Sequence, residues 1–186
     1  GLNSLAFANQ TLKTGAFTMD QPLSIYTLHK LNTYVASGRI YSGLTDGFVY
    51  ESGPSPILTM RTGGSVGPAQ SPTVGVWTVL GNFWNSSSSV HQVKNGLPQG
   101  GDPGLGNFGG LALAATTVPG NFGQVSFGEV IVRSVIDTQI TKWRHVSWLI
   151  RRARLTYYNM ICEGDSLTAG AGLSEVRGAV CHGPSS

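Results

Sequence analysis

The sequence predicts an all-β protein built from antiparallel sheets. Short apolar or alternating runs follow one another from residue 1 to about residue 135, divided by clusters of Gly, Pro, Asn and Ser. Glycine is abundant, with 26 residues among 186, whereas charged residues make up only 11%. No helical pattern separates the runs, and strands that follow one another without helices pair antiparallel. Together these observations favour a sandwich or a barrel with many turns.

The strands are expected where apolar or alternating runs lie between turn residues. In chain order they are Leu5–Phe7, Gly15–Phe17, Leu23–Leu31, Val35–Ser42, Phe48–Glu51, Ile57–Arg61, Val74–Phe83, Ser88–Lys94, Gly110–Ala114 and Val125–Arg133.

Two of these runs also predict how they are buried. Leu23, Ile25, Thr27 and His29 alternate with Ser24, Tyr26, Leu28 and Lys30, which predicts one dry and one mixed face. The run from Val74 to Trp84 is apolar on both faces, so it predicts a central strand. Asn95-Gly96 predicts a tight hairpin turn after the Ser88–Lys94 strand, because both residues tolerate a positive φ.

A helix is expected after the last strand. Asp137-Thr138 is a favourable start, because Asp near a helix N-terminus interacts well with the helix dipole. Apolar residues then recur every three or four positions and predict one buried stripe, made of Ile136, Ile140, Trp143, Val146 or Ser147, and Ile150. Lys142, His145, Arg151 and Arg152 lie largely off this stripe. The helix is therefore expected to pack against the sandwich.

Length, composition and charge limit the class of protein. A chain of 186 residues can form one domain of about 150 residues and an appendage. The largely neutral, polar composition favours a secreted or virion protein, so an extracellular or virion-surface location is expected. No apolar run approaches the ~20 residues of a membrane-spanning helix, and the N-terminus lacks the plan of a signal peptide.

The net charge of +3 has a local origin. Lys142, Arg144, Arg151, Arg152 and Arg154 form a basic cluster. One interpretation is a surface for phosphate or an acidic partner, and the other, which is favoured, is the solvated face of a helix. A nucleic-acid partner is not predicted.

A separate motif lies near the C-terminus. The run from Ile161 to Gly170 contains Gly164-Asp165-Ser166-Leu167-Thr168 after the apolar segment Tyr157–Cys162. It resembles the first block of the SGNH (GDSL) esterases and lipases. The resemblance implies that Ser166 is a nucleophile, that Gly164 permits close backbone approach and that Asp165 braces the turn.

The rest of that hydrolase is missing from the sequence. The family's later blocks include a D-x-x-H pair, yet the residues three places before the four histidines are Tyr26, Ser88, Lys142 and Ala179. A pair of Ser166 with His182 is the remaining internal possibility, but a nucleophile without an oriented base loses orders of magnitude in rate. The favoured interpretation is a truncated hydrolase start, so enzymatic activity is not expected of this chain alone. Cys162 and Cys181 lie in the same appendage, and whether they form a disulfide stays open.

The middle of the chain carries a second resemblance. Its segments follow the strand order of a concanavalin A-like or laminin-G-like jelly roll, over residues 15 to 150. They are Gln21–Tyr26, Gly38–Gly43, Val79–Val90, Asn95-Gly96, Gly101–Gly104 and Phe127–Val132. With the SGNH-like segment behind it, this arrangement resembles phage virion-associated proteins.

The jelly-roll resemblance implies ligands held on a sheet or on rim loops by aromatic and amide groups. The candidates are Trp84, Asn85, Ser87, Asn95, Asp102 and Asn107. The alternative is that Trp84 belongs to the core and that the polar residues only satisfy turns. No metal or other cofactor is predicted. Calcium stays open as the alternative, but it needs clustered carboxylates, whereas Asp46 and Asp102 are isolated from other acids, so a calcium site would depend on backbone carbonyls.

The predicted organisation is a sandwich over residues 1–135, a basic amphipathic helix and linker over 136–155, and an SGNH-like segment with its tail over 156–186. The favoured function is a non-catalytic module of a virion or secreted surface assembly that binds a glycan or a partner protein, as a homo-oligomer or within a larger assembly. Two alternatives stay open: an SGNH-type esterase acting on acylated polysaccharide, and a purely structural capsid or decoration protein. The sequence does not identify the glycan, the host or the symmetry of an assembly.

Overall fold

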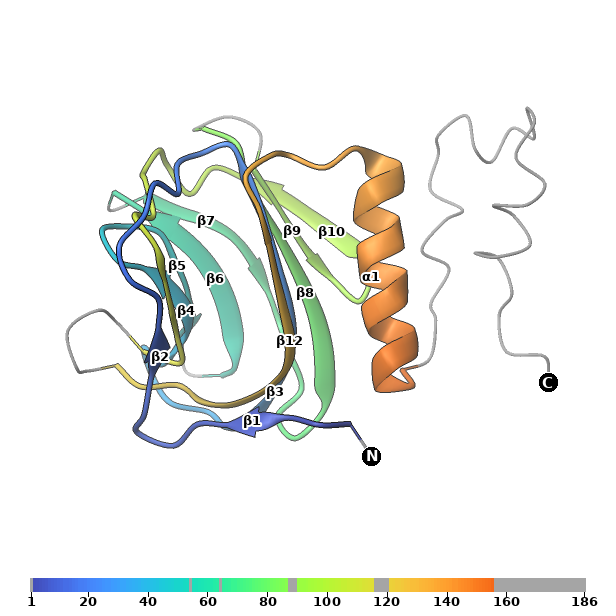
Figure 1. Cartoon of the computed structure of the whole chain (residues 1–186). Coiled ribbons are helices and arrows are strands. Elements are labelled where there is room, and N and C mark those ends of the chain that lie inside the picture. The colour runs from blue at the N-terminus through green and yellow to red at the C-terminus, as the bar shows by residue number, and fades with distance from the viewer. Residues whose placement is uncertain (1, 54, 64, 87–89, 116–120, 156–186) are drawn as a thin grey trace, which may run out of the picture.

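The computed structural model describes residues 2–53, 55–63, 65–86, 90–115 and 121–155. Two six-stranded sheets face each other and one helix, α1 (Gln139–Ala153), covers the outer side of one of them (Figure 1). The predicted antiparallel β-sandwich with a C-terminal helix is confirmed. The SGNH-like segment lies outside the described residues.

The sheet that carries the helix, sheet A, has the order β1-β12-β3-β8-β9-β10, and all of its pairs are antiparallel. Strand β8 lies inside this sheet, as its two apolar faces predict. The strands are β1 (Leu5–Ala6), β3 (Leu23–Thr33), β8 (Trp77–Trp84), β9 (Val90–Lys94), β10 (Leu97–Gly101) and β12 (Gln124–Arg133).

The second sheet, sheet B, has the order β2-β11-β4-β5-β6-β7 and is also antiparallel between its named strands. Neighbours that are not consecutive in sequence mean that the chain crosses repeatedly between the two sheets. The strands are β2 (Leu12–Lys13), β4 (Arg39–Gly43), β5 (Phe48–Ser52), β6 (Ile57–Thr62), β7 (Ser65–Gln70) and β11 (Leu111–Leu113).

Two hydrophobic cores hold these three layers together. The larger core lies between the sheets and includes Leu23, Ile25 and Trp84 from sheet A and Tyr41 and Met60 from sheet B. The smaller core lies between sheet A and the helix and includes Tyr26, Leu28, Phe83, Val146 and Leu149. Burial of apolar side chains from water stabilises both contacts.

The helix accounts for the burial of β3 on both faces. Residues 23–29 of this strand are all buried. Leu23 and Ile25 point into the core between the sheets, while Tyr26 and Leu28 point toward α1. The face that the sequence predicts as mixed is thus covered by a third layer of structure.

A chain of buried hydrogen bonds crosses the larger core. The Trp84 indole N–H donates to Tyr41 Oη (3.1 Å), which donates to Asn82 Oδ1 (2.8 Å). The Asn82 amide donates to Gln92 Oε1 (3.0 Å), and Gln92 Nε2 donates to the Leu58 carbonyl (2.8 Å). The chain begins and ends in different sheets, so it fixes their relative position.

Helix α1 starts where the sequence predicts. Thr138 is the N-cap, and its side chain accepts a hydrogen bond from the backbone N–H of Thr141. The buried stripe is shifted from the prediction: Leu149 is buried, whereas Ile140 is 40% exposed and is wrong as a core position. At roughly 100° per residue, Ile140 lies about 120° around the helix from the buried Val146, so it points away from sheet A.

Several strands differ from the prediction. The second strand forms at Leu12–Lys13 instead of Gly15–Phe17, and β4 begins at Arg39 instead of Val35. Strand β7 was not predicted, because Gly67 and Pro68 interrupt its pattern.

Beyond the predicted hairpin, β10 pairs with β9 as the last strand of sheet A and contains Pro98. Strand β7, the last strand of sheet B, lies against β9 and β10. The two sheets therefore approach each other at this side of the sandwich.

Candidate functional site in a pocket between the helix and sheet A

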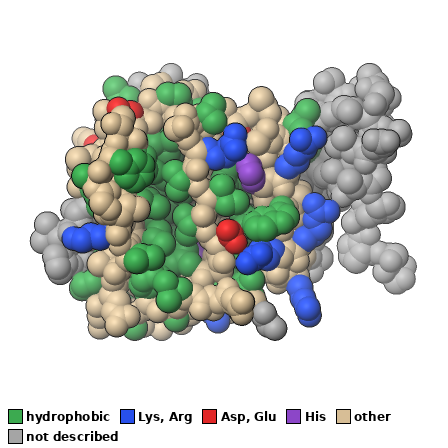
Figure 2. All heavy atoms as spheres, in the orientation of Figure 1, with side chains coloured by type: hydrophobic (Ala, Val, Ile, Leu, Met, Phe, Trp, Pro, Cys, Tyr) green, Lys and Arg blue, Asp and Glu red, His purple; other side chains and the backbone are tan. Residues whose placement is uncertain are grey.

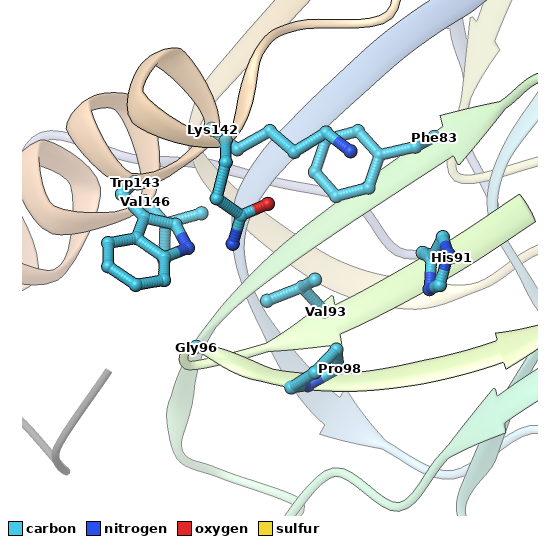
Figure 3. A pocket seen from close by; sticks show the side chains of 9 residues that line it. Phe83, His91, Val93, Gly96, Pro98, Lys142, Trp143 and Val146 are labelled. Atoms are coloured by element: carbon cyan, nitrogen blue, oxygen red, sulfur yellow. The ribbon is translucent and has the colours of Figure 1, made fainter. Parts of the chain in front are cut away.

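A pocket of about 220 Å³ opens between α1 and the outer face of sheet A (Figure 3). It is lined by Phe83, His91, Val93, Gly96, Pro98, Gln139, Lys142, Trp143 and Val146.

The helix wall follows from helical spacing. Gln139, Lys142, Trp143 and Val146 lie at positions i, i+3, i+4 and i+7, which share one face of a helix. Val146 is buried at the base, while Trp143 and Lys142 are half-buried and Gln139 is exposed. The wall therefore changes from apolar at its base to polar at its opening.

The sheet wall is built by the β9–β10 hairpin and the neighbouring strand β8. Phe83 pairs with His91 across β8 and β9, and Val93 pairs with Pro98 across β9 and β10. Asn95 and Gly96 form the turn with φ values of 47° and 96°, as the sequence predicts for a tight hairpin. The Asn95 side chain also accepts a hydrogen bond from the Val79 backbone N–H (2.8 Å), which ties the turn to β8.

Two titratable groups face the pocket. Lys142 Nζ lies 4.1 Å from the centre of the Phe83 ring, a cation–π distance. Burial lowers the pKa of Lys142 below its ordinary value, although the charge of Asp137 acts in the opposite direction. Burial, and then the charge of Lys142, lowers the pKa of His91. The neutral imidazole is thereby favoured, and it can donate through one nitrogen and accept through the other.

The chemistry of this lining suits binding. An aromatic ring and a proline stand at the sides, apolar side chains form the base, and an amide, an amine and an imidazole supply hydrogen-bonding groups. None of the lining residues is an acid, a serine or a cysteine. Within the described part of the chain, no three His, Cys, Asp or Glu side chains come together in a group that could hold a metal ion.

Of the ligand contacts predicted from the sequence, none that the structure describes lines this pocket. Trp84 is fully buried, packs edge-on against Phe108 (centroids 5.0 Å apart) and donates its N–H to Tyr41. Its expected role on a rim is wrong, and the alternative of a core tryptophan holds. Asn95 lies beside Val79, near the start of β8, whereas Trp84 ends that strand. At about 3.3 Å per residue, roughly 17 Å of strand separates Val79 from Trp84, so Asn95 and Trp84 do not share a rim.

The other predicted contacts are half-buried or occupied in turns. Asn85 follows β8 and is half-buried. Asp102 is exposed, and its carboxylate accepts a hydrogen bond from the Gly104 backbone N–H (2.8 Å). Asn107 is exposed, and its carbonyl accepts from the Thr45 hydroxyl. Ser87, Gly164, Asp165, Ser166, Cys162 and Cys181 lie outside the described residues.

Basic side chains gather over the helix, on the part of the surface that also carries a histidine (Figure 2). Arg151 and Arg152 lie in the last helical turn, where cations interact favourably with the helix dipole. Arg152 also forms an ion pair with Glu129 on β12 (3.4 Å). For Arg151 and Arg152 these contacts agree with the interpretation of the basic cluster as a solvated helix face, whereas Lys142 of the same cluster is half-buried in the pocket. No helix in the described residues is long and apolar enough to span a membrane.

No protein-family model and no curated protein matches this sequence. Solved structures do match. Domain 4 of AbnA, a GH43 extracellular arabinanase from Geobacillus stearothermophilus in complex with arabinotriose, has a TM-score of 0.57 at 14% identity. The match covers 81% of this chain and 76% of that domain.

A GH54 α-L-arabinofuranosidase has a TM-score of 0.55 at 13% identity and covers 82% of this chain. The match covers only 40% of that enzyme. At these identities the comparisons show a shared β-sandwich fold, consistent with the predicted concanavalin A-like jelly roll.

Proposed function

We propose that this protein is a non-catalytic glycan-binding module, and that the pocket between α1 and sheet A receives one sugar residue of the glycan. The observation that carries the proposal is the pocket itself, in which the Trp143 ring and three polar side chains surround an apolar base.

The physical match is between the two kinds of surface on a sugar. The C–H faces of a sugar ring pack on aromatic and apolar side chains, here Trp143 and Pro98. The hydroxyls need donors and acceptors at the edges of the ring, and Lys142, His91 and Gln139 supply them. A volume of about 220 Å³ is below the range of roughly 300–1,000 Å³ for drug-sized ligands. The pocket volume therefore suits a single sugar residue at the end or on a branch of a glycan chain.

The comparison with AbnA supports the ligand class, because that domain was solved with arabinotriose. Arabino-oligosaccharides are therefore the first ligands to test. We place the module outside the cell, as part of a secreted or virion surface assembly, in keeping with the extracellular arabinanase and with the low content of charged residues.

The test is a glycan array followed by calorimetric titration of the best ligand. Trp143→Ala should weaken binding by about tenfold or more, and Gln139→Ala should weaken it by a smaller factor. Trp148→Ala is the matched control. Trp148 lies on the same helix, is 42% exposed and contacts Arg152 instead of the pocket. Equal affinities for the Trp143 and Trp148 variants would refute the pocket as the glycan site.

The two other interpretations make different predictions. An esterase completed by residues outside this chain would hydrolyse acylated polysaccharide and lose that activity in Ser166→Ala. A structural shell protein would assemble without binding any glycan. Native mass spectrometry of the natural protein separates these cases. A protomer longer than this chain would support the esterase, and a large symmetric assembly would support the structural shell protein.

A further inference from the structure

A pair of arginines lies on the outer face of sheet B, on the other side of the sandwich from the helix. Val49 and Met60 point into the core, so their neighbours Phe48 and Tyr50 on β5 and Arg61 on β6 point outward. Arg61 pairs directly with Phe48 in the sheet.

Arg39 of β4 completes this group by packing on the two aromatic rings. Its guanidinium carbon lies 3.5 Å from the centre of the Phe48 ring and 5.1 Å from that of the Tyr50 ring. The two rings pack edge to face, with centres 5.5 Å apart. This packing holds the planar guanidinium in one orientation, which lowers the entropy lost when it binds a ligand.

Two of the three guanidinium nitrogens of Arg39 have no hydrogen-bond partner in the described part of the chain. They are the Nε and Nη1 atoms, and both are buried. Unpaired donors of a buried cation are unfavourable, so the charge of Arg39 is poorly compensated within the protein.

The charge of the group is also uncompensated. Burial, and to a smaller extent the charge of Arg61, lowers the pKa of Arg39 to about 10, so Arg39 remains charged at neutral pH. Ion pairs of the described residues involve Arg133, His145 and Arg152, and neither Arg39 nor Arg61. An anion bound beside the two arginines would relieve the repulsion between them.

We propose that Arg39 and Arg61 form a second binding site, which takes the carboxylate of an acidic sugar residue such as a uronate. A carboxylate is attracted by the charge of both arginines and accepts hydrogen bonds from the guanidinium nitrogens that are not buried. The neighbouring rings of Phe48 and Tyr50 offer apolar surface to the sugar that carries the carboxylate. The site lies on the opposite sheet from the helix pocket and uses none of its residues, so it acts independently of that pocket.

The experiment is a calorimetric titration of the whole protein with trigalacturonate at low salt, compared with the methyl-esterified trisaccharide. We expect binding of the acid and at least a tenfold loss with the ester. Arg61→Gln should weaken binding by about tenfold. Arg39→Lys should weaken it as well, because lysine keeps the charge but lacks the planar group that packs on the Phe48 and Tyr50 rings. Trp143→Ala should bind trigalacturonate normally, which separates this site from the proposed sugar pocket.

The control variant is Arg144→Gln, which removes the same charge from an exposed helix position. It should change the affinity by less than about twofold. A sulfated trisaccharide and inorganic phosphate serve as competitors. The proposal fails if the ester binds as well as the acid, if Arg61→Gln and Arg144→Gln lose affinity equally, or if sulfate or phosphate displaces the uronate at equal concentration. Thermal melting of each variant confirms that the fold is intact.

Discussion

The hydroxyl of Tyr26 donates a hydrogen bond of 2.7 Å to Asp137 Oδ2 and so joins the middle of β3 to the start of the helix. Asp137 Oδ1 accepts from Arg133 Nε at 2.6 Å, and the Asp137 backbone N–H donates to Ser24 Oγ at 3.2 Å. Burial and the neighbouring carboxylate raise the pKa of Tyr26 above its ordinary value, so this hydroxyl keeps its proton and remains a donor. The contact sets the position of α1, and with it one wall of the pocket.

Tyr26→Phe should therefore loosen the helix. The substitution removes one hydrogen bond from a buried carboxylate, at a loss of about 1–3 kcal/mol in the free energy of unfolding. Urea denaturation measures this loss, and hydrogen exchange should become faster in Gln139–Ala153 than in β3. Tyr34→Phe is the control, because the exposed Tyr34 hydroxyl bonds only to the Gly53 carbonyl and its loss should change stability by less than about 0.5 kcal/mol. Equal effects of the two substitutions would contradict the proposed role of Tyr26.

Tyr41→Phe should destabilise the contact between the two sheets. Without the hydroxyl, the Trp84 indole N–H and Asn82 Oδ1 both lose a partner in the core. We expect a loss of about 2–4 kcal/mol, since each unpaired buried group is unfavourable by roughly 1–3 kcal/mol. Denaturant unfolding at pH 7 measures it, and a loss below about 1 kcal/mol would show that the chain of hydrogen bonds does not stabilise the sandwich.

Glu51→Gln should stabilise the protein at alkaline pH. Burial raises the pKa of Glu51 to about 7, against the opposing hydrogen bond from the Val35 backbone N–H. An acid with a raised pKa in the folded state destabilises that state once it ionises, so stability falls as pH rises from about 4.5 to about 7. Glutamine stays neutral and should gain on the order of 3 kcal/mol at pH 8, with little gain at pH 4. Thermal melting at both pH values checks this, and an equal gain at both would contradict it.

His29 should give stability a pH dependence opposite to that of Glu51, and His29→Gln should remove it. His29 is fully buried in β3, and burial lowers its pKa to about 4. The unfolded chain takes up a proton near pH 6.5 that the folded protein does not, so His29 lowers stability as pH falls from about 6.5 to about 4.

In the natural protein these two effects oppose each other over nearly the same pH range. Stability should thus vary little between pH 7 and pH 4.5 as far as these residues determine it. In His29→Gln only the effect of Glu51 remains, so the free energy of unfolding should rise as pH falls from 7 to 4.5. In Glu51→Gln only the effect of His29 remains, so the free energy of unfolding should fall over the same range. Each change should amount to up to about 3 kcal/mol. Unfolding curves at several pH values test this, and parallel profiles for the two variants would refute it.

The sequence predicts the sandwich well because alternation and turn residues report directly on local geometry. The Val74–Trp84 run predicts a central strand, and Asn95-Gly96 predicts the hairpin that β9 and β10 form. Strand β7 escapes prediction because Gly67 and Pro68 are unfavourable inside strands, and only its edge position tolerates them. Ile140 shows the limit of periodicity, because it fits the three-to-four spacing of the apolar stripe but lies outside the group of helix residues that pack on sheet A.

The candidate sites depend on contacts between distant segments, and the sequence does not show these. Trp84 predicts a sugar contact only if it lies on the surface, and its position among core residues of both sheets places it inside. Lys142 and Trp143 are visible in the helix pattern, but their meeting with His91 requires α1 to lie over β8 and β9. Arg39 likewise meets Phe48 and Tyr50 only through the pairing of β4 with β5. The alternation of Phe48 and Tyr50 on one outer face is the signal that could have pointed to this site.

The strands at the borders of the sheets decide how copies of this protein can meet. Strands β7 and β10 end their sheets and contain Pro68 and Pro98, which have no N–H to offer another chain. At the opposite borders β1 and β2 are only two residues long. Growth by strand addition, the route to amyloid-like fibres, is thus opposed by a proline at two borders and by very short strands at the other two. A repeating array of this domain would have to grow through its faces and loops, which leaves each copy folded and separable.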